Sequence, residues 1–255
     1  MDKRVRSSRH GEPRFPLSRL PGARVLRPQS GSATHMMPRA RNLHSLFLLI
    51  SILFFLLLNS FVGDEPWEVA LLAVAMYVTL VAATWGLSVE KSLRWPAILL
   101  AASSMLVTLG ALLLQTRALW IANWLFLALF YGFVSITLFN YLGRPGAITS
   151  DHLFASVNVY FLLGLFYDAT FNLIQMLRPG SFVEAGLPAG APISRHSLFY
   201  FSLVTLTTLG YGDVLPKSPL ARTVAALEAI TGVLYIAITV ARLVAAYQRT
   251  ESREG

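Results

Sequence analysis

The hydrophobic positions of this 255-residue chain gather into long uninterrupted stretches, with no alternating pattern typical of strands. Four stretches that lack Asp, Glu, Lys and Arg cover 42–63, 69–89, 95–116 and 118–143. Each contains at least 21 residues, and about 20 helical residues cross the ~30 Å hydrocarbon core of a bilayer. The pattern therefore predicts four membrane-spanning helices in this part of the chain.

Two further apolar stretches carry charged residues. Residues 150–177 begin with Ser-Asp and end before Arg-Pro-Gly, which are helix start and stop signals. Asp168 lies about 26 Å along this helix, so we expect it near the far membrane interface. The last span, 219–247, contains Glu228 and also Arg242, which we expect to snorkel to the cytoplasmic interface. The predicted fold class is all-α transmembrane, with six spans.

The segment between the last two spans, residues 178–218, is too long for a turn and too apolar for a solvent-exposed loop. Its first part, 180–192, is rich in Gly, Pro and Ala and predicts a surface loop. Ser194 is a candidate N-cap for a short helix that runs to about Thr207. At about 20 Å this helix cannot cross the membrane, so we expect a re-entrant loop.

Composition supports a membrane protein, because only 13% of the residues are charged, against about 25% in a soluble domain. The net charge of +8 arises entirely in residues 1–43, which carry ten Lys or Arg and two acidic residues. A basic arm before an apolar helix favours a disordered cytoplasmic flank attracted to anionic lipid over nucleic-acid binding. The absence of cysteine excludes disulfides and thiolate metal sites.

The six spans place both termini on one side of the membrane. Basic residues concentrate on that side, so both termini are predicted to be cytoplasmic. The predicted organisation is a basic arm (1–43), a four-helix region (44–143), a pore domain (150–248) and a short cytoplasmic tail (249–255).

The most specific motif follows the predicted short helix. Residues 207–213, here called the filter segment, read Thr-Thr-Leu-Gly-Tyr-Gly-Asp. Its two glycines permit backbone angles closed to other residues, so that consecutive carbonyls can be aimed at one axis and replace the water around a cation. With the preceding FYFSLVTL, the segment resembles the pore helix and selectivity filter of potassium channels, and the similarity extends over about residues 150–248.

This resemblance implies that potassium ions are bound along the filter segment. Thr208 would provide a hydroxyl and a carbonyl, and the carbonyls above it would come from the residues that follow, Leu209, Gly210, Tyr211 and Gly212. Leu209 stands where Val or Ile is commoner, and in the family this side chain points away from the ions. No other cofactor is expected.

The same resemblance assigns supporting roles around the filter segment. Asp213 lies at the outer mouth, where Tyr200 would act as its donor in place of the commoner Trp. For Glu228 we expect a hydrogen-bonded brace behind the filter, with Thr205 as the candidate partner; the alternative is a protonated or water-satisfied carboxyl. Gly232 matches the inner-helix hinge of the family, and close helix packing is an equal alternative.

A face of the last span could line an apolar inner vestibule, although an ordinary packing face explains the spacing as well. Its residues recur at three- and four-residue intervals: Val233, Ile236, Val240 and Val244.

One filter strand cannot surround an ion, so four chains are required and a homotetramer is expected. Residues 118–143 contain no Lys or Arg, so we expect weak voltage dependence. We assign no function to the first four spans. No metal-ligand spacing, nucleophile with a placed base or phosphate loop supports an enzyme.

The leading hypothesis is a potassium-selective channel in the plasma membrane, and the closest resemblance, to prokaryotic channels, implies a bacterial inner membrane. The alternatives are a poorly selective monovalent cation channel and a non-conducting scaffold or modulatory subunit.

Overall fold

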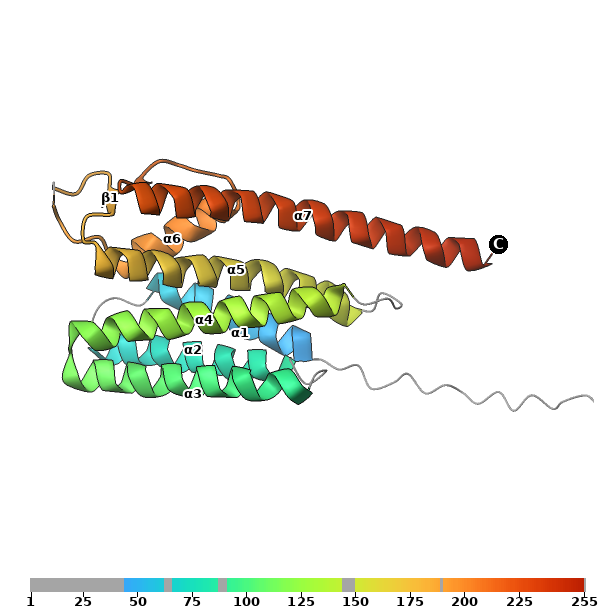
Figure 1. The fold of residues 1–255 in the computed structure, drawn as a ribbon, viewed down its shortest axis with the longest axis horizontal. Coiled ribbons are helices and arrows are strands. Elements are labelled where there is room, and N and C mark those ends of the chain that lie inside the picture. Colours follow the sequence, from blue (N-terminus) through green and yellow to red (C-terminus); the bar gives the residue numbers. More distant parts are fainter. Residues whose placement is uncertain (1–43, 62–65, 87–90, 144–149, 189, 255) are drawn as a thin grey trace, which may run out of the picture. The chain divides into compact units, whose positions relative to one another are not determined.

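The computed structural model describes residues 44–61, 66–86, 91–143, 150–188 and 190–254, so the basic arm predicted at 1–43 lies outside the described residues. Within these ranges the chain is almost entirely helical (Figure 1). The elements in chain order are α1 (His44–Phe61), α2 (Pro66–Gly86), α3 (Lys91–Leu114), α4 (Arg117–Leu142), α5 (Ser150–Leu177), β1 (Phe182–Glu184), α6 (Arg195–Leu206), β2 (Val214–Pro216) and α7 (Pro219–Glu254).

Five of the described helices are long and apolar enough to cross a membrane, so the chain is a multi-pass membrane protein. They are α1, α3, α4, α5 and the part of α7 that ends at Arg242. The second predicted span is also a helix, the 21-residue α2. Its apolar stretch is shorter than expected, Leu71–Thr84, and the helix begins earlier with a Pro-Trp-Glu turn.

Helices α4 and α5 form the centre of the packing. About half of the apolar window of each is buried, 50% for α4 and 56% for α5, against 22% for α1, α3 and α7. Phe130 and Val134 of α4 and Leu162 of α5 belong to one apolar cluster and are fully buried. The outer helices leave Leu, Val, Ile and Phe side chains exposed, as a lipid-facing surface requires.

The short helix α6 lies between α5 and α7 (Figure 1) and contacts both. Ser194 caps it as predicted, because its hydroxyl accepts a hydrogen bond from the backbone N–H of Ser197 at 3.0 Å. The helix ends at Leu206, with Thr207 as its C-cap. One element was not predicted: β1, within the expected loop 180–192, pairs antiparallel with β2 in the register Val183 to Leu215.

Candidate ion-binding site

The backbone turns sharply where α6 ends. Thr208, Gly210 and Gly212 have φ angles of 58°, 57° and 79°, so every second residue of this stretch is in the left-handed region. The glycines adopt this conformation without strain, whereas in Thr208 it costs about 1–2 kcal/mol. The filter segment is therefore not a β-strand, in which successive carbonyls point to opposite sides.

The N–H groups of the filter segment turn back toward α6. Leu209 and Gly210 both donate to the carbonyl of Val204, at 2.9 and 3.4 Å. These contacts anchor the N–H groups of Leu209 and Gly210 on α6. The ion-ligand roles of residues 208–212 stay a prediction.

The filter segment is exposed along its whole length in the single chain. The Leu209 and Tyr211 side chains are 56% and 68% exposed although both are large and largely apolar. Such side chains in a membrane protein need either lipid or protein neighbours. One chain alone thus leaves the filter segment open to its surroundings.

The C-terminal end of the filter segment is held by the β1–β2 pair. The N–H of Ala185 donates to the Asp213 carbonyl at 2.6 Å, next to the paired strands. The rings of Tyr200 and Tyr211 are parallel with centroids 6.5 Å apart. Desolvation, and then the hydrogen bond and negative charge of Asp213, raise the pKa of the Tyr200 phenol. Tyr200 and Asp213 are thus neighbours, as the supporting role predicted for them requires.

Next to the N-terminal end of the filter segment, α5 and α7 both approach the carbonyl of Leu206, the last residue of α6. The Tyr160 hydroxyl of α5 donates to this oxygen at 3.2 Å. A Cβ atom added to Gly232 of α7 would lie 2.1 Å from the same oxygen. This approach is open only to glycine, so the geometry favours the close-packing interpretation of Gly232. Its role as a hinge stays a prediction.

Glu228 is fully buried and contacts the pore helix, but through a different residue from the one expected. Its Oε1 lies 2.5 Å from the hydroxyl of Ser202, which is its hydrogen-bond partner in place of Thr205, the candidate proposed from the sequence. Residues 202 and 205 are three positions apart and share one face of α6, so helical spacing alone does not distinguish them as partners. The same hydroxyl lies 2.8 Å from the carbonyl of Gly164 on α5. Ser202 thus joins three helices behind the filter segment.

The predicted vestibule residues lie on α7 and are about half exposed in the single chain: Val233, Ile236, Val240 and Val244. Such an exposed apolar face is what either a vestibule or a contact with another chain would need. Their part in lining a pore is untested. The guanidinium of Arg242 lies 4.8 Å from the centroid of the Phe139 ring of α4, and its snorkelling to the interface stays a prediction.

Comparison with known proteins identifies the region around this site. A family model described as ion channel matches residues 157–249. This stretch is similar to that ion-channel family and is here called the ion-channel domain. It includes most of α5, the whole of α6 and the filter segment, and α7 as far as residue 249.

Individual relatives resemble the ion-channel domain. The inward rectifier potassium channel Kirbac3.1 of Paramagnetospirillum magnetotacticum is 36% identical over 88 residues, 34% of this chain and 25% of the relative. The potassium voltage-gated channel protein shk-1 of Caenorhabditis elegans is 40% identical over 73 residues, 29% and 14% of the two chains. The human A-type voltage-gated potassium channel KCND3 is 32% identical over 85 residues, 33% and 13% of the two chains. The matched parts thus cover a quarter or less of these relatives.

No solved structure matches the chain significantly. The four-helix region lies outside the part matched by the family model.

Three residues of the ion-channel domain were missed by the sequence analysis: Tyr160, Gly164 and Ser202. Tyr160 and Ser202 place a polar group in an apolar stretch, which is a usable signal of an interhelical bond in membranes. Gly164 lies within a helix, where glycine is unfavourable unless a neighbour approaches closely. Here a Cβ atom on Gly164 would lie 3.2 Å from Leu203 of α6.

The four-helix region carries few charges near the ion-channel domain. Arg117 stands at the first position of α4 and donates to the carbonyl of Met176, at the end of α5, at 2.6 Å. It is thus fixed at the helix terminus. Among the described residues, no group of three or more His, Cys, Asp or Glu could hold a metal ion.

Proposed function

We propose that this protein is a potassium-selective channel that conducts K⁺ passively. The observation that carries the proposal is the left-handed conformation of every second residue from Thr208 to Gly212. Together with the N–H groups anchored on Val204, it leaves a row of main-chain oxygens that can replace the hydration shell of a monovalent cation. The similarity of the ion-channel domain to potassium channels supports K⁺ as the ion.

The conducting unit is a homotetramer of this chain. One strand cannot surround an ion, and the exposure of Leu209 and Tyr211 is relieved when neighbouring chains pack beside them. A fourfold axis would bring four filter segments together and aim the negative carboxyl ends of four α6 helices at the cavity below. The exposed α7 face with Val233 and Ile236 then lines the vestibule or contacts the next chain.

Channel opening depends only weakly on voltage, because residues 118–143 contain no Lys or Arg. Each elementary charge that crosses the field contributes about 2.3 kcal/mol per 100 mV, and α4 offers none in its interior. The distribution of basic residues favours cytoplasmic termini. The prokaryotic relative favours a bacterial plasma membrane.

The test is ion flux through purified protein in liposomes, with K⁺ and Na⁺ gradients applied separately. Wild type should pass K⁺ at least tenfold faster than Na⁺, and Gly210→Asp should lose this preference or all flux because it places a side chain at a left-handed position. Leu209→Val is the matched control and should keep selectivity. Equal K⁺ and Na⁺ flux through wild type would identify a poorly selective channel, and no flux at any voltage would identify a non-conducting subunit.

A further inference from the structure

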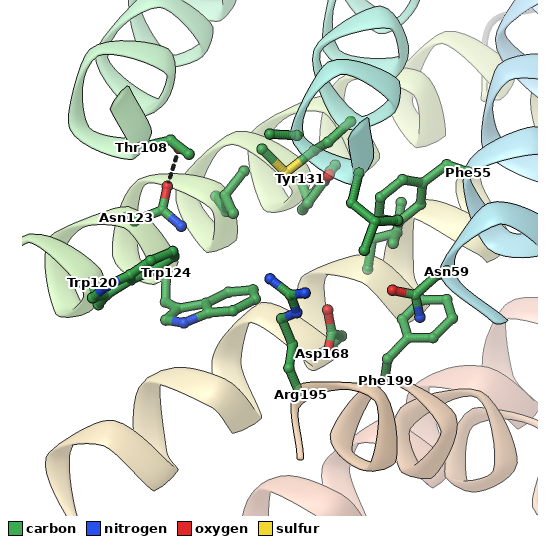
Figure 2. Close-up of a pocket in the computed structure, with 15 residues that line it drawn as sticks. Phe55, Asn59, Thr108, Trp120, Asn123, Trp124, Tyr131, Asp168, Arg195 and Phe199 are labelled. Carbon is green, nitrogen blue, oxygen red and sulfur yellow. Dashed lines mark hydrogen bonds between the residues drawn. The ribbon is translucent and has the colours of Figure 1, made fainter. Parts of the chain in front are cut away.

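A cavity of about 60 Å³ lies where the four-helix region meets the pore helix (Figure 2). Helices α1 to α6 all contribute to its wall. Trp120, Trp124 and Phe199 are among its apolar residues, and Asp168 and Arg195 lie at its centre. Arg195 is the first residue of α6, so the cavity touches the start of the helix that holds the filter segment.

Several polar groups around the cavity are buried. Thr108, Asn123 and Asp168 are 4%, 3% and 8% exposed. Polar side chains inside a membrane protein are costly and mark functional positions. This cavity therefore differs from an ordinary packing defect, which has apolar walls.

Two of the acceptors are already engaged. The Asn123 Oδ1 accepts from the Thr108 hydroxyl at 2.5 Å, and the Asp168 Oδ1 accepts from the Asn172 amide at 2.7 Å. With its oxygen turned to Thr108, the Asn123 side chain presents its amide nitrogen to the cavity (Figure 2). An occupant therefore meets a hydrogen-bond donor and needs an acceptor oxygen.

Charge and size restrict the occupant further. Arg195 and Asp168 offer groups of opposite sign close together at the cavity (Figure 2). A charged occupant would leave one buried charge unpaired, which is strongly unfavourable. Since about 10–15 Å³ of such space holds one water, there is room for about four to six non-hydrogen atoms.

We propose that this cavity binds a small neutral molecule with one acceptor oxygen and a short alkyl part, the size of propanol or butanol. The oxygen accepts from Asn123, and the alkyl part packs against Trp124 and Phe199. Through Arg195 the occupant fixes the start of α6 against the four-helix region, so its binding alters conduction. The effect on conduction rests on the proposed channel function, whereas binding itself does not.

Binding is tested first, without any ion flux. Full-length protein in detergent is titrated with 3-bromo-1-propanol, whose bromine quenches tryptophan fluorescence on contact. We expect saturable quenching. The bromopropanol concentration that gives half-maximal quenching should rise about tenfold or more in Ala73→Leu, which fills the cavity. Ala102→Leu, on the exposed side of α3, is the matched control and should leave the concentration for half-maximal quenching unchanged. Quenching that rises linearly, or equally in both variants, would overturn the site.

Conduction is tested by K⁺ flux through wild type with primary alcohols of increasing length. Occupancy of this cavity predicts that potency rises from ethanol to 1-butanol and falls by 1-octanol, which is too large. Partition into the lipid alone predicts a potency that keeps rising with chain length. A steady rise would refute control from this cavity. Saturable quenching in a protein without K⁺ flux would retain the site and reject the channel function instead.

Discussion

The four-helix region and the pore domain are both helical and apolar, but their polar side chains are used differently. In the four-helix region hydroxyl groups such as those of Thr84 and Thr137 bond to a carbonyl one turn back on their own helix, and Thr79 and Thr108 also reach another helix. In the ion-channel domain more of the described hydroxyl groups join different helices, as those of Tyr160 and Ser202 do. Bonds between helices are thus more numerous in the second region than in the first.

This difference is physically reasonable. Apolar contact in a membrane tolerates small shifts, because helix packing there lacks a hydrophobic driving force and depends on fit. A hydrogen bond requires a donor and acceptor within about 3 Å of one another. A structure that must hold carbonyl oxygens at fixed positions thus gains from the second kind of contact. Equivalent substitutions in the two regions should have unequal effects.

The largest contrast is expected between two glycines. Gly232→Ala places a methyl group 2.1 Å from the Leu206 carbonyl, so α7 must move away from the end of α6. We expect loss of K⁺ flux and a destabilisation of about 1–3 kcal/mol or more. Gly110→Ala in α3 meets only Leu119 at 3.6 Å and should be neutral or stabilising by up to about 1 kcal/mol. Flux assays and thermal unfolding measure both, and equal effects would contradict the contrast.

A second contrast uses two buried serines. Ser202→Ala removes the hydroxyl that reaches Gly164 and Glu228, so we expect a cost of about 1–3 kcal/mol and altered selectivity. Ser135 of α4 is equally buried, but its hydroxyl has no hydrogen-bond partner among the described residues. Ser135→Ala should leave the unfolding temperature unchanged or higher. Should both variants retain wild-type K⁺/Na⁺ flux ratios, Ser202 has no part in positioning the filter segment.

A smaller effect is expected where α7 meets α5 further along. The Tyr235 hydroxyl donates to the Ser156 carbonyl at 2.5 Å, and its ring packs near those of Phe139 and Tyr160. Tyr235→Phe keeps the rings and loses the bond, which should cost about 0.5–1.5 kcal/mol. Tyr235→Leu loses both and should cost more. Single-channel recordings would show altered open times in both variants if this contact restrains α7, and unchanged open times would exclude such a restraint.

The smallest effect is expected in the four-helix region. Thr137→Val removes only a bond to the carbonyl of Phe133 on the same helix, at 2.8 Å. Because the backbone group keeps its helical partner, stability should change by no more than about 0.5 kcal/mol. Flux should equal that of wild type. A loss comparable to that of Ser202→Ala would show that the two regions do not differ in the way described.

Local features of the fold were predictable because short-range chemistry decides them. Ser194 is a helix cap by residue type, and Pro219 opens α7 as a residue suited to a first helical turn. The glycines at 210 and 212 indicated left-handed backbone directly. Apolar length predicted the spans, apart from the shorter apolar stretch of α2.

Contacts between helices were less predictable. The face of α6 that meets Glu228 was identified through Thr205, but the partner is Ser202. Helical periodicity gives the face, whereas the sliding of one helix along another is set by packing across the whole interface. For the same reason neither the Arg242 contact with Phe139 nor the cavity at Arg195 could be derived from spacing along the chain.

The length of α7 has a consequence for the path of an ion through the proposed channel. The helix has 36 residues, about 54 Å, and its membrane-compatible part ends at Arg242. The remainder, residues 243–254, continues for about 18 Å. In the proposed tetramer, four such extensions around one axis would enclose a narrow aqueous volume next to the pore. Ion diffusion through that volume, and not only passage through the filter segment, would then limit the maximum current of the tetramer.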